Sequence, residues 1–266
     1  DFDSSFAVQG TNPQNGIDKY FLSHAEDKFL IDISKIDDQN LQEAYIDIGE
    51  TDGLGYSGVQ ALLGYYGFVI NPMPLEGVDP PNNLNPKRVD SYSSNTAAGT
   101  NGYQHDYFHT SSGQIKKYTF NLSSTYQDRF LIGLNINSYA VSYSETVDFY
   151  ENGYSTSSGI QYLRFYNELA SAGSGVSFQL GMIYKVTPKV RLGLTLDSPT
   201  YFRLAERIYQ FLETDVLNQN DIINLLLDPN ADLLLPEYRF NTPASVRGSF
   251  SYIIGDKGLI SVDYSQ

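Results

Sequence analysis

Three pairs of alternating segments constrain the fold of this chain more than any other feature of its sequence. In residues 118–143, 176–196 and 246–264, apolar side chains occupy every second position of two successive segments, and a very short break separates the segments. A period of two places neighbouring side chains on opposite faces of a β-strand. The sequence therefore predicts three antiparallel hairpins, each with one apolar face and one face of small polar residues.

The phase of the alternation changes once within the first pair. Apolar residues occupy the even positions of 130–136 but the odd positions of 139–143. One extra residue in a strand shifts its side chains to the other face, which is what a β-bulge does. We therefore expect a bulge near Asn137–Ser138. The glycines of Gly173–Gly175 likewise predict a bulge or a close backbone approach.

The connections between the hairpins are far longer than the turns within them. Residues 144–175 and 198–236 separate the pairs. Alternating short and long connections are typical of transmembrane β-barrels, with periplasmic turns short and extracellular loops long. Aromatic residues near the strand ends fit an interfacial girdle. The sequence predicts an all-β protein, a transmembrane antiparallel β-barrel of the bacterial outer membrane, whose long extracellular loops contain short helices. A soluble β-sandwich is the alternative fold, but its loops are seldom so unequal in length.

The composition of the chain excludes several kinds of partner and site. The chain of 266 residues has a formal net charge of -14, which argues against nucleic acid as a partner, because phosphate binding needs clustered cations. It has no Cys, so disulfide and thiolate metal sites are excluded. No apolar run approaches the length of a transmembrane helix.

The first part of the chain differs in charge from the rest. Residues 1–56 carry 12 acidic residues and three Lys, a balance of -9, against -5 for 57–266. Within this acidic loop and helical segment, Asp38–Ile48 has the spacing of a short helix. Residues 57–266 are expected to hold the strands and long loops, with about seven or eight strands in total, including strands near 59–70 and 161–170. Residues 71–113 have no periodic pattern, which indicates either missed elements or long loops.

The sequence shows no arrangement of residues that is typical of a catalytic site. His105 and His109 stand four apart in a stretch that reads as a solvated loop, so we expect no metal site. No nucleophile elbow, acid–base pair or calcium loop is found. The sequence therefore predicts a protein that is not an enzyme and that needs no cofactor.

Two sets of residues are candidates for binding. Thr200–Val216 has a helical apolar stripe within an expected extracellular loop, which is either a cluster that packs the loop or a groove that captures hydrophobic molecules. The candidate capture residues are Phe202, Ile208, Phe211 and Leu212. On the polar strand face, the side chains either bond to one another in a filled interior or line a polar conduit. The candidate lumen-lining residues are Asn135, Asn137, Gln179, Arg191, Asp197 and Arg247.

Three motifs resemble the FadL/OMPP1/TodX family of outer-membrane transport proteins, in the form common among Bacteroidetes. Residues 173–204 (GSGVSFQLGMIYKVTPKVRLGLTLDSPTYFRL) are similar to that family's strand, T-P-K turn and P-T-Y exit. Residues 242–266 (TPASVRGSFSYIIGDKGLISVDYSQ) and 117–136 (KYTFNLSSTYQDRFLIGLNI) resemble two of its hairpins.

The resemblance implies a 14-stranded barrel that passes long-chain fatty acids or aromatic hydrocarbons across the outer membrane by passive diffusion. An apolar extracellular groove would capture the molecule, and an N-terminal hatch would plug the lumen. The chain lacks the family's hatch element, because Asn71–Pro74 is no substitute for it. We therefore expect a single-domain barrel fragment, 1–266, that lacks the hatch and the C-terminal strands and holds about half to two thirds of the barrel.

Two functions remain open on these grounds. The first is a porin-like channel for hydrophobic molecules, in contact with outer-membrane lipid. The second is a barrel of the same fold that serves as a scaffold or accessory subunit of a secretion or assembly complex, with other outer-membrane proteins as partners.

Overall fold

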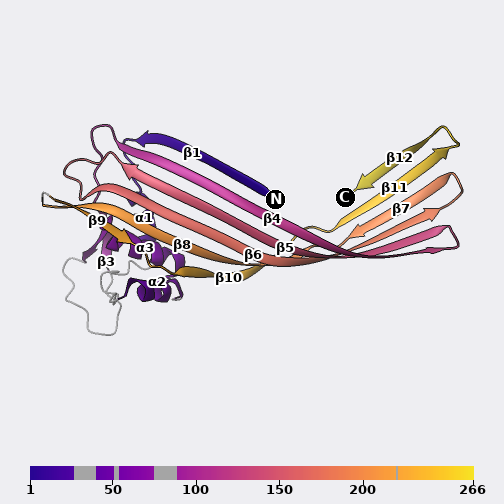
Figure 1. The fold of residues 1–266 in the computed structure, drawn as a ribbon, viewed down its shortest axis with the longest axis horizontal. Helices are drawn as coiled ribbons and strands as arrows, with labels where there is room; N and C mark the ends of the chain where they lie inside the picture. Colours follow the sequence, from indigo (N-terminus) through magenta and orange to yellow (C-terminus); the bar gives the residue numbers. More distant parts are fainter. Residues whose placement is uncertain (27–39, 51–53, 75–88, 220) are drawn as a thin grey trace.

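The computed structural model describes residues 1–26, 40–50, 54–74, 89–219 and 221–266. It is mostly antiparallel β-sheet with three short helices (Figure 1). The strands are β1 (Phe2–Asn12), β2 (Ile70–Pro74), β3 (Val89–Ser94), β4 (Tyr103–Tyr126), β5 (Phe130–Asn152), β6 (Ile160–Lys185), β7 (Val190–Asp197), β8 (Tyr201–Asn218), β9 (Asp221–Leu227), β10 (Asp232–Asn241), β11 (Ser245–Ile254) and β12 (Gly258–Ser265). The helices are α1 (Asp18–Ala25), α2 (Leu41–Glu50) and α3 (Gly55–Tyr66).

One large sheet organises the molecule. Its strands run in the order β1–β4–β5–β6–β7–β11–β12, and β8 pairs with β6 beyond the point where β7 ends. Strands β9 and β10 pair in turn with β8, and every pair is antiparallel. The described strands form an open sheet whose path ends at β1 and β12.

The sheet has two halves that share the long strands β4, β5 and β6. We call one the turn half: β4 from Tyr118, β5 up to Ser138, β6 from Val176, and β7, β11 and β12. We call the other the helix half: the remaining parts of β4, β5 and β6, with β1 and β8–β10. The two halves lie at opposite ends of the molecule (Figure 1). Both chain termini lie near the waist between them.

The short turns predicted from the sequence are confirmed in the turn half. Tyr126 pairs with Phe130 across the first turn, and Ile254 pairs with Gly258 across the last. Gln127 and Asp128 both have positive φ, at 49° and 53°. Consecutive left-handed residues match the right-handed twist of the flanking strands, which is why they close a tight hairpin.

The long loops predicted from the sequence are wrong. Residues 144–175 are mostly the outer parts of β5 and β6, and residues 198–236 contain β8, β9 and part of β10. The segment near 161–170 is indeed strand, but the expected strand near 59–70 is mostly helix α3. The described part of the chain contains twelve strands rather than seven or eight.

The bulge expected near Asn137–Ser138 is also absent. The pairing of β5 with β4 and with β6 runs through this point without a register shift. The backbone therefore keeps its phase, and it is the apolar side chains that change faces.

The helices pack against the same end of the sheet, beside β8, β9 and β10 (Figure 1). Helix α2 confirms the predicted helical segment, since Ala44, Tyr45 and Ile48 are buried on one face. Its first two predicted residues, Asp38 and Gln39, lie outside the described residues, as do 27–37 and 51–53 of the acidic segment. Asn40 Oδ1 accepts the N–H of Gln42, which satisfies one free donor of the first turn.

Helix α3 is buried from Gly58 to Gly64, so it lies within the core of the helix half. A Cβ on Gly64 would stand 2.8 Å from the Cβ of Phe21. Glycine is required there because α1 and α3 approach closely.

Residues 71–113, in which the sequence shows no periodic pattern, contain strands that were not predicted. They hold most of β2, all of β3 and the first residues of β4. Residues 75–88 of that segment lie outside the described part.

Candidate functional site

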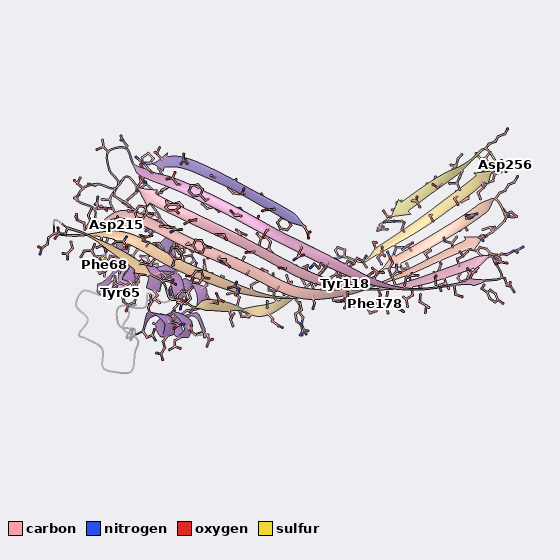
Figure 2. The ribbon with its side chains drawn as sticks, viewed as in Figure 1. Tyr65, Phe68, Tyr118, Phe178, Asp215 and Asp256 are labelled. Atoms are coloured by element: carbon pink, nitrogen blue, oxygen red, sulfur yellow. The ribbon has the colours of Figure 1, made fainter. Side chains whose placement is uncertain are left out.

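We call the face of the large sheet that carries Tyr118 and Phe178 the outer face, and the opposite face the inner face. In the turn half, the outer face is a continuous apolar surface, which we call the apolar belt. Its side chains are the even-numbered residues of the paired strands, and the register brings them into rows across the sheet. Most are exposed although they are large and apolar, as Figure 2 shows for Tyr118 and Phe178. The belt contains Tyr118, Phe120, Leu122, Tyr126, Phe130, Ile132, Leu134, Ile136, Val176, Phe178, Leu180, Met182, Tyr184, Leu192, Leu194, Leu196, Val246, Phe250, Tyr252, Ile254, Ile260, Val262 and Tyr264.

The opposite, inner face of the turn half carries a ladder of polar side chains. Asn121 donates to Asn135, Asn135 donates to Gln179 over 2.6 Å, and Gln179 donates to Asp197. Ser245 extends the ladder by donating to Asp197 over 2.8 Å. The ladder thus crosses β4, β5, β6, β7 and β11 in one row. Side-chain amides suit such a row because each carries both donors and an acceptor.

A second polar row lies next to the ladder. Thr119 donates to Asn137 Oδ1 over 2.8 Å, and Asn137 donates to Ser177 over 3.2 Å. Asn135, Asn137, Gln179 and Asp197, which the sequence predicts on one face, lie together on the inner face. Asn135, Gln179 and Asp197 are joined by hydrogen bonds, whereas Asn137 bonds within the neighbouring row.

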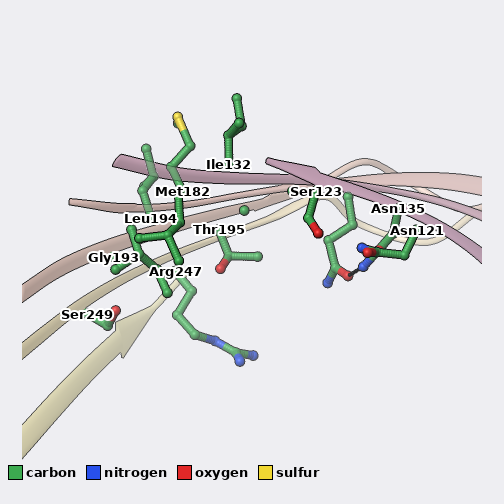
Figure 3. A pocket seen from close by; sticks show the side chains of 15 residues that line it. Asn121, Ser123, Ile132, Asn135, Met182, Gly193, Leu194, Thr195, Arg247 and Ser249 are labelled. Atoms are coloured by element: carbon green, nitrogen blue, oxygen red, sulfur yellow. Dashed lines mark hydrogen bonds between the residues drawn. The ribbon is translucent and has the colours of Figure 1, made fainter. Parts of the chain in front are cut away.

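The ladder borders a hollow of about 470 Å³ on the inner face. Arg247 extends into it while Ile132, Met182 and Leu194 point to the opposite side of the sheet (Figure 3). Arg191 lies on the same inner face as Arg247, paired with Lys185 and Ser251 at the turn end. The two arginines share a face with the ladder but stand apart from its hydrogen bonds.

In the helix half the inner face is aromatic and then apolar. Nearest the waist, Phe202 stacks on Phe240 at 4.9 Å between ring centroids and contacts Tyr139 at 5.7 Å. Phe2 and Phe6 lie on the same inner face at the β1 edge of the sheet, against Tyr143 and His109. Farther from the waist, the helices cover the inner face and form the core of the molecule.

The expected helix over Thr200–Val216 is wrong, because the segment forms β8. Burial alternates along it with period two, from buried Leu204 to buried Thr214. Apolar residues on the inner face recur at spacings of four, and the aromatic residues Tyr209 and Phe211 lie on the outer face. The two faces together produce a pattern that imitates a helical stripe.

The candidate capture residues are therefore separated. Phe202 lies in the aromatic band, whereas Ile208 and Leu212 are only 8% and 0% exposed, because they pack against the helix core. Phe211 lies on the outer face, stacked on Tyr166 at 4.9 Å. Phe202 alone among the four lies on the inner face outside the core.

A buried carboxylate joins the helices to the sheet. Glu151 is 0% exposed and accepts hydrogen bonds from the Ile17 N–H and the Tyr154 hydroxyl, at 2.7 and 2.6 Å. Its Oε2 also lies 2.7 Å from His105 Nε2. Burial raises the pKa of Glu151 above its ordinary value, because it penalises the charged form, while these three partners oppose that rise.

The histidines thus lie on β4 and not in a loop. His109 Nε2 is 3.1 Å from Glu145 Oε1, so each histidine pairs with its own carboxylate. In the described ranges, no group of three metal-ligating side chains comes together. Glu151 was not predicted from the sequence, because it lies in a segment taken for a loop. Phe202 was predicted as a binding residue, but its place beside Tyr139 and Phe240 depends on the pairing of β8 with β6 and β10.

The small residues of Gly173–Gly175 serve a close approach. A Cβ on Gly175 would stand 2.6 Å from the ring of Phe202, and one on Gly173 would collide with the carbonyl of Arg203. The pairing of β6 with β8 is regular here, so the close approach is confirmed and a bulge is not.

Among the described residues, no helix has the length and apolar character needed to cross a membrane. No protein-family model and no curated protein matches the chain.

Proposed function

We propose that this chain is part of the wall of an outer-membrane β-barrel of the FadL/OMPP1/TodX type, which takes up hydrophobic small molecules by passive diffusion. The apolar belt carries the proposal. A soluble protein rarely exposes so large a contiguous apolar surface. Lipid would cover the belt, and an aqueous lumen would face the polar ladder.

The inner face supports the passage of hydrophobic molecules. The aromatic band of Phe202, Phe240 and Tyr139 stands between the helix core and the polar ladder. A hydrophobic molecule that entered beside the helices would meet aromatic rings before it met amides. The resemblance of residues 173–204, 242–266 and 117–136 to the family also implies the passage of hydrophobic molecules.

Two measurements test the proposal. Gel mobility in SDS before and after boiling tests the barrel, because a closed barrel resists detergent until it is heated. Uptake of labelled long-chain fatty acid by cells that carry the full-length protein tests the transport. We expect a heat-dependent shift and faster uptake, and either a soluble protein or unchanged uptake would contradict the corresponding half of the proposal.

The substitution Phe202→Ser should slow uptake if the aromatic band lies on the route. Phe108→Ser is the matched control, because Phe108 is a half-exposed ring on the outer face of the helix half, against Tyr150. Equal uptake by the two variants would remove the aromatic band from the mechanism.

One observation favours the scaffold function as a second candidate. Helices α1–α3 cover the inner face at one end of the sheet, where a channel would need an opening. Affinity purification from native membranes distinguishes the two functions. A stoichiometric set of partner proteins with no fatty-acid uptake would support the scaffold.

A further inference from the structure

A second hollow, of about 590 Å³, lies at the waist. Its polar and charged lining comes mostly from the outer face: Ser138, Ser174, Arg203, Arg239 and Asn241. Val176 and Tyr201 line it on the side of the apolar belt. The hollow therefore lies where the apolar outer surface gives way to a polar one.

Register places three cations in one row of this surface. Lys116 pairs with Ala140, Ala140 with Ser174, Ser174 with Arg203, and Arg203 with Arg239. The neighbouring row on the turn side runs from Tyr118 through Val176 to Tyr201, at the margin of the belt. The cationic row is thus the first row beyond the belt.

The two arginines at the hollow, Arg203 and Arg239, lack the close carboxylate partners that Arg164 and Arg207 have on the same face. Arg207 lies 2.9 Å from Asp232 and 3.4 Å from Glu168, and Arg164 forms two hydrogen bonds to Asp148. Arg203 has only a long 3.8 Å contact with Glu237, and both side chains are more than half exposed. In the described part of the chain, no carboxylate pairs with Arg239.

Directly opposed like charges destabilise a pair of strands unless an anion lies between them. We propose that the hollow binds the phosphorylated headgroup of an anionic membrane lipid, with its acyl chains lying on the belt below. The inference rests on the proposed membrane location of the belt. Guanidinium groups bind phosphate oxygens in a bidentate manner, and the hydroxyls of Ser138 and Ser174 add further donors.

The position of the row agrees with a lipid as the source of the phosphate. Headgroups lie at the edge of the hydrocarbon region, where aromatic side chains such as Tyr118 and Tyr201 are also favoured. The whole chain carries a net charge of -14, so an anion needs a local cluster of cations to approach this surface.

The test uses the full-length protein in detergent micelles doped with diphosphoryl lipid A, and native mass spectrometry counts the bound lipid. The double substitution Arg203→Gln/Arg239→Gln should weaken binding on the order of tenfold or more, because each cation near a membrane surface adds to the attraction. Arg207→Gln is the matched control. It removes one arginine from the same strand and face, but one that carboxylates already neutralise, and it should bind lipid like the wild type.

Equal binding by the double variant and the wild type would overturn the site. Competition by millimolar inorganic phosphate would overturn the lipid assignment, since a free phosphate would then suffice. Each sample is also run on a gel with and without boiling. A heat-dependent shift without lipid binding refutes only this site, whereas a missing shift in the wild type refutes the membrane location on which it rests.

Discussion

The two halves of the sheet share β4, β5 and β6 but reverse the placement of their apolar side chains. In the turn half, large apolar residues such as Leu134 lie on the outer face, and amides such as Gln179 lie on the inner face. In the helix half, the apolar residues Leu163 and Leu212 lie on the inner face, where they are 0% exposed beneath the helices. Charged and aromatic residues occupy the outer face there.

This reversal occurs without any shift in the pairing register. The pairing of β5 with both neighbours is regular through Asn137 and Ser138. A strand assigns each residue to a face by its position alone, but the surroundings decide which face is apolar. A phase change in a sequence can therefore mark a change of environment along one continuous strand. Seven substitutions test the difference between the two halves.

The largest effect is expected for Leu212→Ala in the helix half. The side chain is fully buried against the helix core, so its truncation should lower the free energy of unfolding by about 3 to 4 kcal/mol. Leu194→Ala is the matched truncation in the belt, where the side chain is already 37% exposed, and it should cost far less. Urea titration in detergent measures both, and similar losses would contradict the difference between the halves.

An arginine placed on the outer face should destabilise the turn half more than the helix half. Leu134→Arg, in the middle of the belt, should cost about 3 kcal/mol in lipid vesicles if lipid covers that surface. Ser142→Arg lies on the same face of the same strand but in the helix half, and it should cost well under 1 kcal/mol. Urea titration in vesicles provides the comparison, and a tolerated arginine at position 134 would argue against a lipid-facing belt.

Glu151→Gln tests the attachment of the helices to the sheet. An amide carries no charge and resembles the protonated acid, so the variant and the wild type should be similarly stable below pH 4.5, and the difference between them should grow as the pH rises. Because its folded pKa is raised, wild-type Glu151 binds its proton more tightly in the folded state than in the unfolded state. Stability should therefore fall as pH rises from the ordinary value of 4.5 through the folded pKa.

Thermal unfolding across that pH window measures the effect. The Glu151→Gln variant should lack this part of the slope, since it has no proton to release. A slope identical to that of the wild type would show that another group carries the pH dependence.

The smallest effect is expected in the polar ladder. Gln179→Ala removes hydrogen bonds to Asn135 and Asp197, but water can replace them on an open face, so the loss should be about 0.5 to 1 kcal/mol. Gln210→Ala is the matched change in the helix half, where Gln210 is 0% exposed and bonded to Tyr45 and Gln60. It should cost about 2 kcal/mol, because its buried partners lose their hydrogen bonds. Equal losses in the free energy of unfolding, measured by urea titration, would mean that water is excluded from the ladder as it is from the core.

The turn half could be predicted from the sequence because one of its faces carries apolar side chains throughout and the other carries polar ones. Phe120, Ile136 and Phe178 alternate with Thr119, Asn137 and Ser177, so the period of two is visible without any knowledge of the partners. The helix half could not be predicted in this way. Tyr209 and Phe211 on one face of β8 and Ile208 and Leu212 on the other are all apolar or aromatic, and the alternation is lost.

The sequence by itself determined the antiparallel hairpins, their tight turns, helix α2 and the polar set of Asn135, Asn137, Gln179 and Asp197. Each of these depends on neighbours in the chain or on a strict local period. Only the tertiary structure decided that β5 and β6 continue past the waist, that Phe211 is separated from Phe202, and that Arg203 faces Arg239. These arrangements depend on pairing between strands that are distant in the chain, and the register of that pairing is set by packing against the helices and across the sheet.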